Sequence, residues 1–353
     1  MQLGIYSFGD RARRVDGETS SAQAQRNLLE AIQLADQVGL DYFGIGEHHT
    51  ELAPASAAAT ILAGAATTTS RILLGSAVTV LSTDDPVRVY QQFATLDALS
   101  NGRAEITAGR GSSTESYPLF GYRLEDYDRL YSEKLDLLMT IDAQQPVTWT
   151  GTVRPALRDA VIVPRPDSGH LPIWLGTGGS PGSSLRAGQL GLPVAYGIIG
   201  GEPARFRRVV ELYRQSFAQS GHPATQARVS VGTPGFVAPN DVDAHELWWV
   251  GWNELAAELA EERGFRRPTR AQFDADSHAD GALFIGDPEQ VAARIVALHA
   301  SLGHMRHFLQ MDIGRLPQRD FLRSIELLGT VVKPLVDREL GPEPEDLRGS
   351  ISR

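Results

Sequence analysis

One carboxylate and two imidazoles stand together at Glu47, His48 and His49, directly after the apolar run 42–46. Such a run predicts a strand buried on both faces, and the chemistry of α/β proteins gathers at the carboxyl ends of these strands. An imidazole placed there can move a proton to or from a bound substrate. The same side chains can instead cap the strand through hydrogen bonds to nearby carbonyls, so their types alone leave both roles open.

A metal site at these residues is not expected. Neighbours on a strand point to opposite faces, so at most one of His48 and His49 should face a common cleft unless the backbone has already turned. Zinc would need a further ligand, and the chain has no Cys to supply a thiolate. Glu47 and His49 are therefore interpreted as orienting or structural residues.

The segment 176–184 is rich in Gly and Ser and lies between a short apolar run and a helical segment. Gly residues let backbone N–H groups turn inward, Ser hydroxyls add donors, and the helix N-terminus favours negative charge, which together predict a phosphate cradle. The segment is neither the dinucleotide fingerprint nor the Walker loop, because it lacks the glycine spacing of these motifs and the Lys of the Walker loop. A Gly/Ser turn with a helix N-cap is the alternative interpretation.

Two arginines are candidates for the same phosphate. Arg110 lies between Gly109 and Gly111 at the end of a strand-like run, where the glycines leave room for its guanidinium. Arg129 lies in the next helical segment with Glu133 one turn further on, and a surface ion pair explains it equally well.

Strand-like runs alternate with amphipathic helical segments along the chain, which is typical of βαβ units with a parallel sheet. The expected strands cover residues 2–7, 42–46, 72–80, 104–109, 173–176, 194–199, 229–237 and 307–312. Eight strands without an obvious linker favour a single (β/α)8 TIM barrel over residues 1–340, rather than an open doubly wound sheet. Insertions are expected as a hairpin near 148–166 and a long helical segment near 243–280, and residues 341–353 are expected to fray.

Charge and composition narrow the class of partner. A formal net charge of -10 disfavours a general nucleic-acid or anionic-membrane surface. The chain shows no run of about 18 apolar residues and no leader-like start. We therefore expect a cytoplasmic protein that acts on a small-molecule substrate, with no nucleic-acid or membrane partner.

Four motifs in order carry a resemblance: Glu47-His48-His49, 82–88, 96–103 and 109–111. Together they resemble the bacterial luciferase-like family of flavin-dependent monooxygenases, over most of the chain up to the turn at 286–289. The resemblance implies a luciferase-like barrel that binds reduced flavin mononucleotide (FMN) at its carboxyl-end mouth and uses dioxygen to oxygenate a small organic substrate. Light-emitting members have a Cys before the first arginine, whereas Gly109 stands here, which argues against a true luciferase.

The resemblance also implies roles for individual residues. His48 is the catalytic residue beside the flavin, and a non-proline cis peptide at Ala77-Val78 lies under the flavin ring. The implied phosphate ligands are Arg110, Arg129, Gly176, Thr177, Gly178, Gly179 and Ser180. The family tends to form homodimers, which is the expectation here.

Several alternatives stay open. The reduced flavin is expected from a separate flavin reductase, because no nicotinamide fingerprint is visible. Hydride transfer with a 5-deazaflavin is the alternative chemistry, since relatives of this barrel bind that cofactor in nearly the same cleft, and a non-catalytic flavin-binding barrel is the alternative of another class. The tryptophans at 248, 249 and 252 fit either packing or a lid over an apolar substrate.

Overall fold

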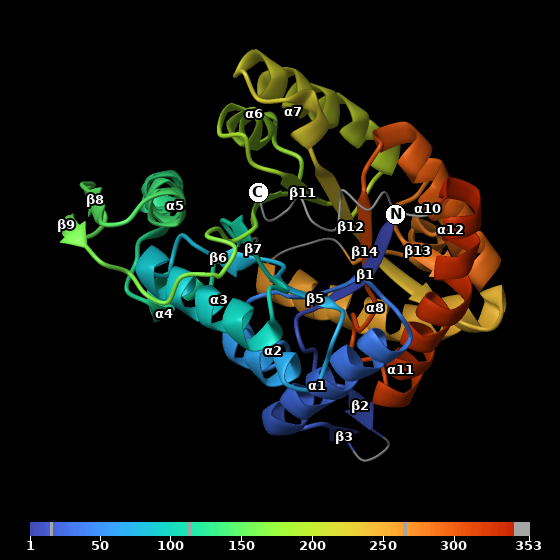
Figure 1. Ribbon diagram of the computed structural model, residues 1–353. Coiled ribbons are helices and arrows are strands. Elements are labelled where there is room, and N and C mark those ends of the chain that lie inside the picture. The colour runs from blue at the N-terminus through green and yellow to red at the C-terminus, as the bar shows by residue number, and fades with distance from the viewer. Residues whose placement is uncertain (15–16, 112–113, 264–266, 342–353) are drawn as a thin grey trace.

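A closed barrel of eight parallel strands forms the centre of the protein in a computed structural model that describes residues 1–14, 17–111, 114–263 and 267–341 (Figure 1). The barrel strands are β1 (Gln2–Ser7), β4 (Tyr42–Ile45), β5 (Leu73–Ser76), β7 (Ala104–Gly109), β10 (Ile173–Thr177), β11 (Val194–Gly197), β12 (Val229–Val237) and β14 (Arg306–Gln310). Pairing runs in sequence order from β1 to β14, and β14 pairs back with β1, so that no edge is left. The predicted TIM barrel is confirmed.

Helices surround the barrel (Figure 1). They are α1 (Ser21–Gln37), α2 (Ala58–Ala66), α3 (Pro86–Ser100), α5 (Tyr127–Ala143), α6 (Pro181–Gln189), α7 (Arg207–Gln219), α10 (Pro288–Leu302), α11 (Gln318–Leu327) and α12 (Lys333–Leu340), with the π-turn η4 (Leu328–Val332) joining the last two. Local sequence sets their starts: Asp85 accepts hydrogen bonds from the N–H groups of Val87 and Arg88, and Pro86 occupies the first turn of α3. None of the described helices is long and apolar enough to cross a membrane.

Several shorter strands and helices complete the fold. The third expected strand is interrupted: β5 is followed by a break at residues 77–78, and β6 (Thr79–Val80) then pairs with the end of β7. The remaining short elements are β2 (Arg13–Arg14), β3 (Gly17–Glu18), α4 (Ser116–Leu119), η1 (Leu124–Asp126), η2 (Pro203–Phe206), η3 (Ala224–Gln226) and β13 (Phe284–Gly286). The antiparallel pair β8 (Val147–Trp149) and β9 (Leu157–Ala160) projects beside α5 at the left of Figure 1.

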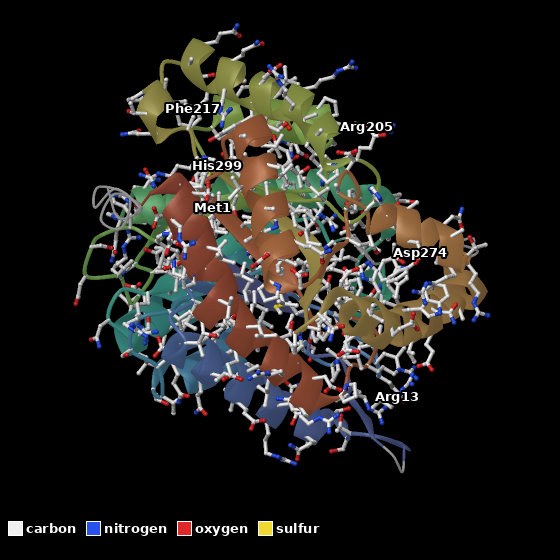
Figure 2. The ribbon with its side chains drawn as sticks, turned by 90° about the vertical axis from the view of Figure 1, so that its right-hand side faces the viewer. Met1, Arg13, Arg205, Phe217, Asp274 and His299 are labelled. Atoms are coloured by element: carbon white, nitrogen blue, oxygen red, sulfur yellow. The ribbon has the colours of Figure 1, made fainter. Side chains whose placement is uncertain are left out.

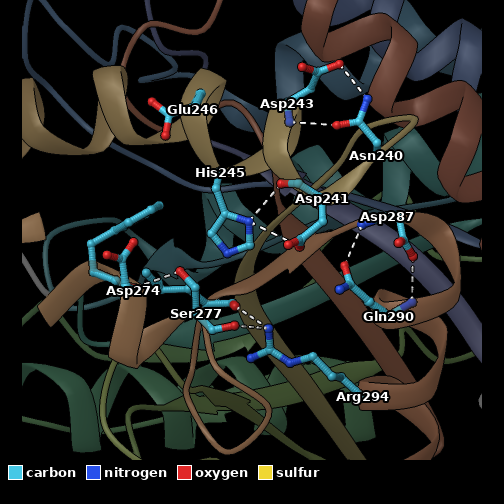
Figure 3. Close-up of polar contacts among 12 residues, drawn as sticks. Asn240, Asp241, Asp243, His245, Glu246, Asp274, Ser277, Asp287, Gln290 and Arg294 are labelled. Atoms are coloured by element: carbon cyan, nitrogen blue, oxygen red, sulfur yellow. Dashed lines mark hydrogen bonds and ion pairs between the residues drawn. The ribbon is translucent and has the colours of Figure 1, made fainter. Parts of the chain in front are cut away.

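A helical insertion, α8 (Asp241–Arg263) and α9 (Arg270–Asp276), lies between β12 and β13. Trp248 of α8 is fully buried and donates its indole N–H to the Met311 carbonyl at 3.4 Å, and its ring stacks on Trp252 at 5.6 Å. Polar contacts fasten the same region: His245 contacts Asp241, and Arg294 of α10 donates to the Ser277 carbonyl at 2.9 Å (Figure 3). Trp248 therefore packs inside the protein. Over the rest of the molecule, charged side chains point outward (Figure 2).

An ion pair fills the amino end of the barrel. Arg306, the first residue of β14, donates to both carboxylate oxygens of Glu105 in β7, at 2.6 and 3.0 Å, and both side chains are 2% exposed. The Arg306 guanidinium also donates to Gln2 at 2.7 Å and lies between the rings of Tyr42 and Trp174, at 4.5 and 4.9 Å. Residues from five strands thus close this end of the barrel.

Aromatic rings form the next layer, because glycines on the neighbouring strands leave room for them. A Cβ atom at Gly75 would lie 2.6 Å from the Tyr42 hydroxyl, and one at Gly232 would lie 2.4 Å from the Phe308 ring. The Phe308 ring in turn meets the edge of Tyr6 at 5.2 Å. Tyr6 and Phe308 are the floor of the space above them.

Replacing Glu105 by Gln should destabilise the protein by about 3–5 kcal/mol, because the substitution leaves the buried Arg306 charge without its counter-charge. Urea denaturation followed by circular dichroism measures this loss. Glu326→Gln is the matched control, since its pair with Arg323 is exposed and such pairs contribute at most about 1 kcal/mol. Equal, small losses in both variants would contradict a stabilising role for the buried pair.

Candidate active site

A cavity of about 400 Å³ opens at the carboxyl ends of the barrel strands. Catalytic sites of TIM barrels lie at this end, and the volume is within the range of small-molecule sites. Its lining is drawn from β1, β6, β7, β10, β11 and β14 and from the loops that follow β1, β4, β5, β7, β10 and β11, and includes Tyr6, Phe8, His48, His49, Val80, Glu115, Ile199 and Phe308.

Both imidazoles of the Glu47-His48-His49 motif line the cavity. Strand β4 ends at Ile45, before the chain reaches them, so the alternation of a strand no longer applies. Glu47 connects its own loop to β6: one oxygen lies 2.9 Å from His49 Nε2, and the other accepts the Val80 N–H at 2.9 Å. The interpretation of Glu47 as an orienting residue agrees with these contacts.

His48 has a partner that no sequence motif indicated. Its Nδ1 lies 2.7 Å from a carboxylate oxygen of Glu115, and its ring meets that of Phe8 at 4.4 Å. Glu115 is 67 positions further along the chain, at the start of α4, and only the fold brings it to His48. Nothing in its local sequence distinguishes it from the other acidic residues of that loop.

The peptide bond between Ala77 and Val78 is cis, as the resemblance implied, and both residues line the cavity. Glycines on the neighbouring strands admit this segment. A Cβ atom at Gly109 would lie 2.4 Å from Val78 Cγ2, and one at Gly176 would lie 2.7 Å from Val78 Cγ1. The two glycines therefore allow the Val78 side chain to enter the mouth of the barrel.

The segment after β10 has the form expected of an anion cradle. Gly176, Thr177, Gly178 and Ser180 line the cavity, and a Cβ atom at Gly178 would meet nothing within 4 Å. Ser180 caps α6, because its hydroxyl oxygen accepts the Ser183 N–H at 3.2 Å. The N-terminus of α6 thus lies beside open space, where its N–H groups favour an anion.

Arg110 reaches the same cradle from β7. It donates to the Ser183 hydroxyl at 3.0 Å and to Asp128 at 2.8 Å, and its guanidinium lies 5.2 Å from the centre of the Tyr127 ring. A cation, the Ser180 hydroxyl and a helix N-terminus therefore converge on one part of the cavity. This donor set fits a phosphate group.

Two predicted cofactor residues are not in the cavity lining. The Arg129 side chain is 55% exposed and forms a surface pair at 2.7 Å, with Asp126 rather than with Glu133, whose carboxylate accepts hydrogen bonds from Thr152. Gly179 turns away at a φ of 95°, and a Cβ atom there would lie 2.5 Å from the Phe206 ring. Gly179 therefore shapes the cradle through its backbone.

Tyr6 brings a phenol to the floor of the cavity. Burial raises the pKa of Tyr6, and the negative charge of Asp312 raises it further, so the hydroxyl stays protonated near neutral pH. Burial also raises the pKa of Asp312 to about 6, against the lowering effect of the hydrogen bond from Ser7. Tyr6 can therefore donate a hydrogen bond to a bound molecule.

Among the described residues, no group of three or more His, Asp or Glu side chains could hold a metal ion.

Residues 1–305 match the family model of the luciferase-like monooxygenases. The chain belongs to this family. The 4-hydroxyprotoasukamycin monooxygenase of Streptomyces nodosus subsp. asukaensis is 32% identical over 320 residues, which cover 87% of this chain and 85% of that one. The F420-dependent glucose-6-phosphate dehydrogenase of Beutenbergia cavernae is 36% identical over 186 residues, which cover 50% of this chain and 54% of that one.

Solved structures share the luciferase-like fold. A monooxygenase from Streptomyces bottropensis superposes with a TM-score of 0.80 at 22% identity, over 95% of this chain and 99% of that one. The oxygenating constituent of 3,6-diketocamphane monooxygenase from Pseudomonas putida, in complex with FMN, gives 0.75 at 20% identity, over 95% and 98%. Luciferase-like proteins thus include FMN-binding monooxygenases and F420-dependent oxidoreductases, and this chain is an oxidoreductase of that family.

Replacing Gly109 by Ala should destabilise the protein by about 1–3 kcal/mol, because the new methyl group overlaps Val78 and forces it to shift. Gly178→Ala, at the same mouth but facing open space, is the matched control and should leave the free energy of unfolding almost unchanged. Thermal unfolding of the two variants measures the difference. Similar melting temperatures would show that Val78 is not held against Gly109.

Proposed function

We propose that this protein is an FMN-dependent monooxygenase that uses reduced flavin and dioxygen to oxygenate a small organic substrate. One observation carries the proposal: a single cavity joins a phosphate cradle, formed by Arg110, Ser180 and the N-terminus of α6, to the imidazole of His48. The cradle suits the phosphate of a mononucleotide, and the imidazole suits proton transfer.

Each part of the cavity has a role in this proposal. The backbone and hydroxyls of 176–180, with Arg110, hold the phosphate, and Ala77 and Val78 support the flavin ring. When bound, FMN supplies the reaction with dioxygen and the transfer of one oxygen atom to the substrate. His48 moves a proton at the reacting group, and the apolar lining keeps water away from it.

The source of electrons and the assembly are further parts of the proposal. A separate flavin reductase supplies the reduced flavin, because the chain lacks a dinucleotide fingerprint. We also propose a homodimer. In this scheme NADH alone leaves FMN on the purified protein oxidised, and addition of a reductase starts turnover.

The alternative cofactor is a 5-deazaflavin, which the name of the Beutenbergia cavernae relative supports. A deazaflavin-dependent enzyme would transfer hydride and would not consume dioxygen. Titrating the protein with FMN and with F420 compares the two directly. Tight binding of F420 alone, with hydride transfer from an alcohol or sugar phosphate to the deazaflavin, would replace the FMN proposal.

Arg110→Ala should weaken FMN binding by roughly 10–100-fold, because each charge-assisted hydrogen bond to phosphate contributes about 1.5–3 kcal/mol. Riboflavin lacks the phosphate, so its affinity should not change. Flavin fluorescence titrations of the variant and parent with both ligands measure this difference.

Arg123→Ala is the control for that titration, since Arg123 pairs with Glu125 on the surface. Arg129→Ala tests the expectation that Arg129 also binds the phosphate. A loss of FMN affinity equal to that of Arg110→Ala would show that Arg129 is a phosphate ligand. If Arg110→Ala lost equal affinity for FMN and for riboflavin, the arginine would not bind the phosphate.

His48→Ala should lower product formation by about 100-fold or more, because it removes the proton-transfer group while leaving the phosphate cradle intact. A screen of candidate substrates with reduced FMN and dioxygen measures oxygen uptake and product together. His170→Ala, which removes an imidazole outside the cavity lining, is the control and should match the parent. Identical products and rates in His48→Ala would exclude the role of His48, and FMN binding without product from any substrate would favour a non-catalytic flavin-binding barrel.

A further inference from the structure

The two adjacent imidazoles of the cavity contact carboxylates through different ring nitrogens. His48 uses Nδ1, which lies 2.7 Å from Glu115, and His49 uses Nε2, which lies 2.9 Å from Glu47. All four side chains line the cavity, and each imidazole is at most 16% exposed. Neighbours in sequence therefore present opposite nitrogens to their partners.

This difference has a chemical consequence for the neutral rings. An ionised carboxylate only accepts hydrogen bonds, so the ring nitrogen next to it must carry the hydrogen. His48 then carries its hydrogen on Nδ1 and keeps the lone pair on Nε2. His49 carries its hydrogen on Nε2, and its lone pair is on Nδ1. A carboxylate on one ring nitrogen is a common means of fixing the tautomer and orientation of a functional histidine.

The surroundings hold each pair in place. The Phe8 ring meets the His48 ring edge-on, with 83° between their planes, which restricts rotation of that imidazole. The second oxygen of Glu47 is occupied by the Val80 N–H, so Glu47 is anchored to the backbone beside β6. Glu47 belongs to the motif itself, whereas Glu115 comes from a distant loop, and each carboxylate contacts a different histidine.

We propose that Glu115 is a positioning residue for His48: it accepts the Nδ1 hydrogen and leaves Nε2 as the proton acceptor, while Glu47 holds His49 in the opposite tautomer. When Nε2 takes a proton from a bound reactant, the positive imidazolium forms beside the Glu115 carboxylate, which stabilises it. The tautomer assignment stands on the contacts alone, and its catalytic consequence rests on the proposed function.

Histidine-ring ¹⁵N NMR of the full chain tests the tautomers without a cofactor. In protein labelled with ¹⁵N-histidine, the signals that disappear in His48→Gln belong to His48, and those that disappear in His49→Gln belong to His49. We expect the Nδ1–H form for His48 and the Nε2–H form for His49 at pH 8. An Nε2–H form for His48 would overturn the proposal.

Substitutions at Glu115 then test whether this carboxylate fixes the His48 tautomer. In Glu115→Gln the amide can donate to Nδ1 as well as accept from it, and in Glu115→Ala the acceptor is gone, so both variants should lose the dominance of the Nδ1–H form. Glu115→Asp should retain it in part. Glu125→Gln removes an exposed carboxylate from the same loop and should leave the His48 signals unchanged. Unchanged His48 signals in folded Glu115→Gln and Glu115→Ala would also overturn the proposal.

Kinetics separate this inference from the proposed function. Once a substrate is identified, Glu115→Gln should lower kcat by about 10–100-fold and leave FMN affinity unchanged, as expected when the residue that positions a functional histidine is removed. A loss of FMN affinity with unchanged kcat would assign Glu115 to cofactor binding instead. If the tautomers are as expected but reduced FMN and dioxygen yield no product, the monooxygenase proposal fails and the positioning of His48 stands.

Discussion

The ion pair between Arg306 and Glu105 determines which end of the barrel can bind a ligand. It joins β14 to β7 across the interior, is fully buried, and is completed by Gln2 and two aromatic rings. Two charges removed from water must satisfy each other, so these residues are held tightly and leave no room for a ligand. The open space is therefore at the carboxyl ends, above the rings of Tyr6 and Phe308.

The shape of that space depends on where the strands carry glycine. Gly75 admits the Tyr42 ring, Gly232 admits the Phe308 ring of the floor, and Gly109 and Gly176 admit Val78 at the mouth. A barrel interior is normally filled by branched side chains in layers. Here the ion pair and aromatic rings fill the lower layers, and small residues leave the upper layer open, so that a candidate anion cradle and an imidazole share one cavity.

The barrel was predictable because its signals are local. Alternation of apolar runs with helical segments indicates parallel βαβ units, and Asp85-Pro86 indicates the start of α3 at the observed position. The interruption of the third strand at Ala77 was not visible in apolar patterning, which continues through residue 80. Its cis bond was expected through family resemblance, and not through the physics of the segment itself.

The sequence by itself determined the barrel, the candidate phosphate-binding segment and the residue types of the candidate site, because strand periodicity, helix caps and Gly/Ser content act over a few neighbouring residues. Tertiary structure alone decided which groups meet. It paired His48 with Glu115 and Arg110 with Ser183. These contacts depend on the register and closure of eight strands, and no local pattern encodes the distance between two side chains that are tens of residues apart.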